Sequence, residues 1–185
     1  MKQMIARLLV AAAVAVGAAL PAAQAAHAGP VEPDVPSDIA APAGSKLFLV
    51  GHAVGVQIYR CNATASGYRW SFVGPRADLY GDTGKLIATH FAGPRWQALD
   101  GSQALGAFVR GVSVDPAAIP WLLLSASGSA GADGDRLAGT TSIQRINTTG
   151  GLIPAAEECH AGSAGVVNEV PYTADYYFYK GGDRV

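Results

Sequence analysis

The sequence predicts an all-β fold: a single-domain antiparallel β-sandwich or barrel of about eight to ten short strands, with one disulfide. Short stretches rich in β-branched and aromatic residues recur along the chain, separated by Gly, Pro and Asp turn signals about every dozen residues. Beyond residue 28, no stretch carries an apolar stripe at helical spacing. The chain has 2 cysteines, so one disulfide is the most it can form.

Residues 1–28 have the pattern of a secretory signal peptide. Lys2 and Arg7 give a positive start, residues 8–20 are an unbroken apolar run, and Ala-x-Ala cleavage patterns follow at 23–25 and 26–28. The run is too short to span a membrane. No basic flank or stop-transfer pattern follows that would favour a retained anchor. We therefore expect a secreted, extracytoplasmic protein without a membrane span.

The charge balance argues against a nucleic-acid partner. The chain holds 13 basic and 14 acidic residues. Removal of residues 1–28 takes away Lys2 and Arg7 but no acidic residue, which leaves a net charge of −3. The sequence contains no basic cluster of the kind that binds nucleic acid or a membrane surface. Roughly 155 residues remain, enough for one domain with its own core.

Cys61 and Cys159 are expected to form the disulfide. An isolated pair in an exported chain is most simply oxidised. Closing a loop of nearly 100 residues stabilises a fold by about 4 kcal/mol in the chain-entropy model. A metal site at the cysteines is disfavoured, because His160 beside Cys159 does not have the spacing of zinc ligands.

Residues 29–44 are expected to form a Pro/Ala-rich extended arm that leads into a single β-domain over residues 45–185. Prolines at positions 30, 33, 36 and 42 exclude a helix and disfavour a central strand. Within the domain, residues 68–72 alternate most clearly between aromatic and polar side chains. The other expected strands cover residues 46–53, 54–61, 77–80, 85–91, 95–99, 103–114, 119–125, 140–148 and 171–180.

A five-residue pattern occurs twice, as Phe-Val-Gly-Pro-Arg at residues 72–76 and Phe-Ala-Gly-Pro-Arg at residues 91–95. Two copies are too few for a repeat architecture, but they favour two similar strand–turn–strand crossings. A second turn signal, Asp100-Gly101, is typical of a hairpin turn that requires positive φ.

Residues 85–102 concentrate side chains that could act chemically. His90, Asp100 and Ser102 are the three residue types of the Ser-His-Asp catalytic triad found in hydrolases. The chain has no Gly-x-Ser-x-Gly elbow, and Ser102 after an Asp-Gly turn fits a structural turn residue better than a nucleophile. His52 and His90 are candidate metal ligands if their strands are neighbours, although neither belongs to a ligand motif. No cofactor is expected, and an enzyme is the less favoured class.

Aromatic residues favour a binding surface instead. The three tryptophans and the C-terminal tyrosines exceed what one small core needs, so some could line an apolar mouth or a sugar-stacking face. The competing interpretation is that they are core and sheet-face residues. The candidate binding residues are His90, Arg95, Trp96, Tyr177 and Tyr179.

Seven short blocks stand out: GVQIYRC at residues 55–61, WSF at 70–72, HFAGPRW at 90–96, DGS at 100–102, IPWLLL at 119–124, TGG at 149–151 and VPY at 170–172. In this order they resemble the signature of a secreted bacterial and fungal family that is catalogued only as a domain of unknown function. The resemblance covers essentially the whole β-domain. It implies an exported single domain and supplies no activity or catalytic residues.

Fungal members of that family often carry the label malate dehydrogenase, which this sequence does not support. The chain has no Gly-x-Gly-x-x-Gly after a strand and no alternation of strands with helices. The favoured expectation is a secreted β-domain that binds a small molecule, a glycan or a surface partner. The alternatives are the hydrolase or metal-dependent enzyme described above, and a structural envelope or matrix protein without a site.

Overall fold

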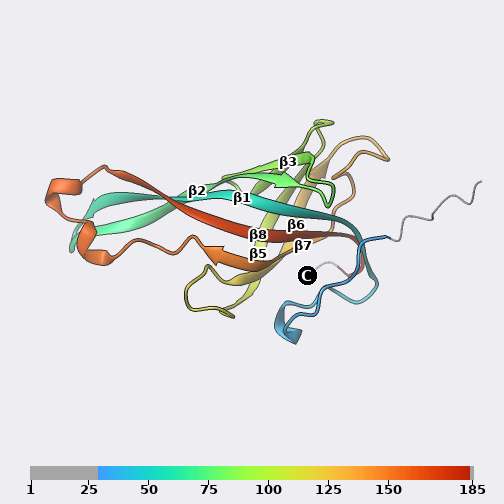
Figure 1. Cartoon of the computed structure of the whole chain (residues 1–185), viewed down its shortest axis with the longest axis horizontal. Coiled ribbons are helices and arrows are strands. Elements are labelled where there is room, and N and C mark those ends of the chain that lie inside the picture. The colour runs from blue at the N-terminus through green and yellow to red at the C-terminus, as the bar shows by residue number, and fades with distance from the viewer. Residues whose placement is uncertain (1–28, 184–185) are drawn as a thin grey trace, which may run out of the picture.

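The computed structural model describes residues 29–183, and in them eight antiparallel strands follow one another around a closed barrel (Figure 1). Each strand pairs with its neighbours in sequence, and the last pairs with the first. The all-β fold and its disulfide are confirmed, and the architecture is the barrel. Its strands are β1 (Ser45–Thr64), β2 (Gly67–Tyr80), β3 (Leu86–Phe91), β4 (Arg95–Ala98), β5 (Gln103–Val112), β6 (Trp121–Ala130), β7 (Ser142–Gly150) and β8 (Val167–Gly181).

β1 and β2 each span two stretches that the sequence predicts as separate strands. β1 runs uninterrupted through Gly55, where a Cβ atom would overlap the backbone of Arg76 and Ala77 on β2. β2 likewise continues past the Gly-Pro pair that was expected to end it. The register there shifts by one residue and leaves Val73 without a partner on β1, which is a β-bulge.

The barrel interior is filled by large aromatic side chains set among small ones. The Trp96 ring lies 5.3 Å from the Tyr176 ring and 5.9 Å from the Phe178 ring, both edge-on. Six alanines from six strands fill the rest of this core between the larger residues: Ala53, Ala77, Ala88, Ala98, Ala104 and Ala174. This alternation of large and small residues suits the interior of an eight-stranded barrel.

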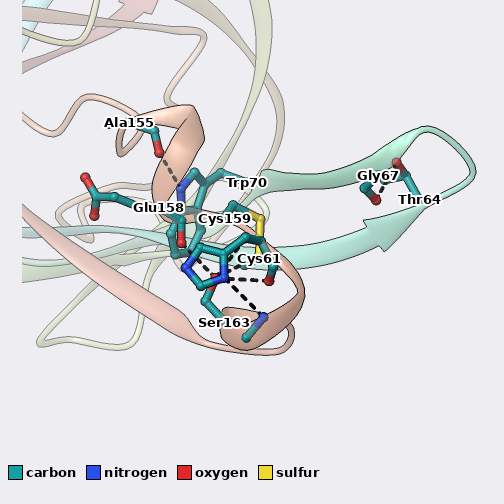
Figure 2. The surroundings of a disulfide bond; sticks show 10 residues. Cys61, Thr64, Gly67, Trp70, Ala155, Glu158, Cys159 and Ser163 are labelled. Carbon is teal, nitrogen blue, oxygen red and sulfur yellow. Dashed lines mark hydrogen bonds between the residues drawn. A yellow bond between two sulfur atoms is a disulfide. The ribbon is translucent and has the colours of Figure 1, made fainter.

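A long extension leaves one end of the barrel, built from the distal parts of β1 and β2 and the start of β8 (Figure 1). The Cys61–Cys159 disulfide joins β1 to the loop before β8. Figure 2 shows Trp70 beside this disulfide, with its indole N–H donated to the Ala155 carbonyl at 3.1 Å. Two short 3-10 segments, η2 (Ala156–Glu158) and η3 (Ala161–Ser163), flank Cys159 in this loop, and Tyr59, Cys61, Trp70 and Cys159 form a second core.

Residues 29–44 pack across the outer face of the barrel rather than projecting from it. Their one 3-10 turn, η1 (Ser37–Ile39), places Ile39 fully buried against Leu123 and Ile146. The Gln144 amide donates to the Ile39 carbonyl at 2.6 Å. No helix among residues 29–183 is long and apolar enough to cross a membrane. The expected signal peptide lies outside the described residues.

Replacing both cysteines, C61A with C159A, is expected to lower the free energy of unfolding by about 3–5 kcal/mol, because the unfolded chain then loses a closed loop of about 100 residues. The sequence separation of the pair is 98. Urea unfolding of the wild type with and without reductant, beside the double variant, measures the effect. Reduced wild type should match the double variant, whereas equal stability of all three forms would contradict the prediction.

Candidate functional site

A pocket of about 250 Å³ opens where β1 and β2 leave the barrel for the extension. Because it is the mouth of the barrel interior, side chains from every strand reach its wall. In strand order these are Gln57, Phe72, His90, Trp96, Phe108, Leu124, Arg145 and Tyr176. Alternation along each strand explains the set, since these residues share the inward face with the buried core.

The two copies of the Gly-Pro pattern meet at this mouth. Gly74 and Pro75 belong to the bulged part of β2, and Gly93 and Pro94 form the β3–β4 turn. The two segments touch, because a Cβ atom on Gly74 would lie only 2.6 Å from the Cβ of Ala92. The predicted turn at residues 74–75 is thus a bulge inside a continuous strand. The bulge shapes the pocket rim.

His90 is a deeply buried polar group of the pocket, with 3 % of its surface exposed. Its ring stacks on Trp96 with centroids 4.3 Å apart and planes 6° apart. Nδ1 lies 2.9 Å from the Arg95 carbonyl oxygen, which can only accept, so Nδ1 carries the proton and Nε2 presents a lone pair. Burial lowers the pKa of His90 to about 3, against the opposing effect of the Arg95 carbonyl. The ring is therefore neutral at pH 7.

Two N–H groups of the wall have no hydrogen-bond partner within the described part of the chain. They are Gln57 Nε2 and Trp96 Nε1, on side chains that are 2 % and 1 % exposed respectively. A buried donor left unpaired typically costs about 1–3 kcal/mol, and most buried polar groups in proteins are satisfied. Both donors belong to residues that line the same cavity, where an acceptor could bind them.

The rim of the pocket is apolar and exposed. Phe108 on β5 is 68 % exposed and Phe72 on β2 is 57 % exposed, although both line the mouth. Large apolar side chains are seldom left uncovered together at the edge of a cavity, and such patches mark interaction sites.

Asp100 and Ser102 belong to the β4–β5 turn, at the opposite end of β4 from the β3–β4 turn. Ser102 Oγ donates to Asp100 at 2.6 Å and accepts the Leu137 N–H at 3.0 Å. The second Asp100 oxygen accepts the Arg136 N–H at 2.7 Å. The Ser102 hydroxyl, followed by the backbone N–H groups of Arg136 and Ser102, lowers the pKa of Asp100 to about 2. The pair secures a loop, and the structure does not bring it to His90.

His52 and His90 lie on opposite faces of the barrel wall. His52 faces outward and is half-exposed, with Nδ1 2.6 Å from Asp175 and Nε2 3.0 Å from Asp82. Hydrogen bonds to Asp82 and then Asp175 raise the pKa of His52. No cluster of His, Cys, Asp and Glu side chains suited to a metal ion occurs in residues 29–183. The structure does not bring the two histidines to a common site.

Three other predicted binding residues lie outside the pocket wall. The Arg95 guanidinium lies 5.8 Å from the Phe91 ring centroid. Tyr177 packs in the outer cluster under the N-terminal arm. Tyr179 is fully buried, and its hydroxyl lies 2.7 Å from Gln144 Oε1. Alternation along β8 separates these tyrosines from Tyr176, which does face the pocket.

Sequence reasoning missed Gln57, Arg145 and Tyr176 as site residues. Tyr176 carried a usable signal, because it alternates with Tyr172 and Phe178, which are buried in the barrel. Gln57 and Arg145 carried no signal that would assign them to the site, since a polar residue in a half-buried strand ordinarily faces water.

His90→Asn is expected to make the protein less sensitive to acid. The pKa of His90 is about 3 in the folded state and about 6.5 in the unfolded chain, so the unfolded state binds a proton first as the pH falls. Wild-type stability should therefore drop by on the order of 1 kcal/mol per pH unit below about pH 6. Urea unfolding from neutral pH downward compares the two proteins. Parallel pH profiles would show that His90 does not titrate this way.

His52→Gln is expected to lower the free energy of unfolding most at low pH, where His52 is protonated. The folded pKa of His52 is raised above 6.5, so its ion pairs stabilise the protein fully below that pH and lose their effect as pH rises through the folded value. The group is half-exposed, which limits the effect to at most about 1 kcal/mol. The stability difference between wild type and variant should shrink as the pH rises through the folded pKa of His52, and also in high salt. A difference that grows with pH would contradict this.

No match is found among curated proteins or among solved structures. A family model does match, over residues 42–180, which include all of the barrel except Gly181 at the end of β8. The match confirms the resemblance to a domain family of unknown function. The chain belongs to the family described as Protein of unknown function (DUF3455).

Proposed function

We propose that this chain is an exported domain that binds a small, largely apolar molecule in the pocket at the mouth of its barrel. The observation that carries the proposal is the convergence of all eight strands on one cavity with an apolar wall, an exposed aromatic rim and a few buried polar groups. Ligand sites have this composition, with polar groups that fix orientation and apolar surface that supplies affinity.

The size of the pocket limits the ligand. Eight-stranded barrels are either filled by side chains or hold one small molecule. A dry cavity of about 150 Å³ accepts benzene. The pocket here has about 250 Å³, so it suits a substituted single ring or two fused rings.

The wall favours a compact molecule over a glycan. Trp96 is 1 % exposed and one face of its ring is covered by His90, so it offers no open surface on which a sugar could stack. The hydrogen-bonding groups are held in one state: burial keeps His90 neutral and raises the pKa of the Tyr176 hydroxyl, so that it stays protonated. Such fixed partners orient a ligand without themselves reacting.

Export is supported by two independent features. The Cys61–Cys159 disulfide is the kind of bond that persists in oxidising compartments. The N-terminal sequence has the pattern of a signal peptide.

Filling the pocket tests the binding proposal. Leu122→Trp places a larger side chain in the pocket wall, and Leu99→Trp makes the same change at a turn residue that is 67 % exposed. Indole, p-cresol and 2-naphthoate at millimolar concentration are the probes, with thermal shift and calorimetry as readouts. Wild type and L99W should bind at least one probe, and L122W should bind none.

A milder variant, Leu122→Phe, guards against misfolding of L122W, and circular dichroism checks both. Partial filling should weaken binding without abolishing it. If L122W is folded and binds as well as wild type, the pocket is not the site.

A further inference from the structure

We propose that the ligand of this pocket carries a carboxylate, and that Arg145 binds it through the two terminal nitrogens of its guanidinium. The inference rests on the proposed function above and names its ligand class: a small organic acid with one or two rings.

Arg145 occupies an inward-facing position on β7. Ile143 lies in the barrel core, whereas Gln144 and Ile146 face the N-terminal arm on the outside, so alternation turns Arg145 inward. Its cross-strand partners are Leu122 on β6 and Tyr176 on β8, and both line the pocket. The guanidinium thus sits in the pocket wall at a fixed place in the sheet.

One edge of the guanidinium is anchored and another is free. Nε and Nη2 both donate to the Pro120 carbonyl oxygen, at 3.2 Å and 2.7 Å. A guanidinium has five N–H groups, so both N–H groups on Nη1 and one on Nη2 remain. One N–H group on each of Nη1 and Nη2 lies along the terminal edge, which can hold a carboxylate with two parallel hydrogen bonds. The Pro120 contact therefore fixes the plane of the group and does not use this edge. The Tyr176 hydroxyl is a further hydrogen-bonding neighbour of the guanidinium in the pocket wall.

The charge of Arg145 is not neutralised by the protein. The ion pairs formed within residues 29–183 do not involve it, and no acidic residue contributes to the described pocket wall. The charge acts on the buried groups around it, since it further lowers the pKa of His90 and opposes the rise that burial causes in the pKa of Tyr176. A half-buried cation facing an apolar cavity favours an anionic ligand.

Other wall groups favour the same chemistry. Gln57 Nε2 and Trp96 Nε1 are donors without partners, and an ionised carboxylate is a pure acceptor. A phosphate would bring a second negative charge and a larger hydration shell, against a single cation in this wall. A singly charged carboxylate on an apolar ring fits both the charge and the volume.

Matched acid and amide probes test this inference. Benzoate with benzamide, and 2-naphthoate with 2-naphthamide, differ in charge while keeping the same ring. Calorimetric titration of the wild type should show each acid binding about tenfold or more tightly than its amide. Arg145→Gln should remove that preference, and Arg145→Lys should keep only part of it, because lysine keeps the charge but lacks the planar fork.

Arg76→Gln is the matched control. Arg76 lies on the outside of β2, where it pairs with Glu169 at 2.6 Å, and it takes no part in the pocket wall. The acid preference should survive this change. Because Arg145 also holds Pro120, the folding of both R145 variants is checked by circular dichroism, and the wild-type comparison stands even if they fail to fold.

The outcomes separate the carboxylate inference, the role of Arg145 and the proposed function. Equal binding of acids and amides by wild type would overturn the carboxylate inference and leave the pocket as a binding site. A preference that persists in folded R145Q would overturn the role of Arg145. Absence of binding by every probe to wild type would overturn the proposed function together with this inference.

Discussion

The pairing of β8 with β1 is the interaction on which the rest of the structure depends. It closes the sheet, so that no strand of the barrel is left with an unpaired edge. With eight strands, closure also fixes the width of the interior. β1, β2 and β8 continue past the barrel as the extension. The pocket opens at the end of the barrel where these strands leave it.

The described residues form three separate hydrophobic cores, with one tryptophan in or against each. Trp96 lies inside the barrel, Trp70 packs beside the disulfide in the extension, and Trp121 lies under the N-terminal arm. The cores at the disulfide and under the arm are small, so a large side chain supplies much of the apolar surface that each buries. The cavity at the barrel mouth opens from the barrel core, and Trp96 is the tryptophan in its wall.

Local patterns in the sequence predicted the fold class and the disulfide, and they could not predict closure. Alternation and turn signals act over a few residues, whereas β1 and β8 are separated by most of the chain. Glycine was ambiguous for the same reason: Gly74 was expected to end a strand, whereas it lies inside β2, in close contact with Ala92. The barrel, rather than a sandwich, is a property of non-local pairing.

The site was partly predictable. His90 and Trp96 were chosen from a stretch dense in reactive side chains, and both lie in the pocket wall. Asp100 and Ser102 were close to His90 in sequence, but the short β4 carries them to the far turn. Arg145 could not be chosen, because an arginine in a strand ordinarily faces solvent. Only the structure shows that the N-terminal arm covers the outer face of β7, which leaves Arg145 on the inner face.

NMR titration of the protein with 2-naphthoate tests the pocket as a binding site most directly. The expected result is a set of shifts confined to the mouth: the Trp96 indole N–H, the Gln57 amide, the Arg145 Nε–H, and backbone amides of the β3–β4 turn and the β2 bulge. Shifts confined to the extension or to the outer face under the arm would contradict it.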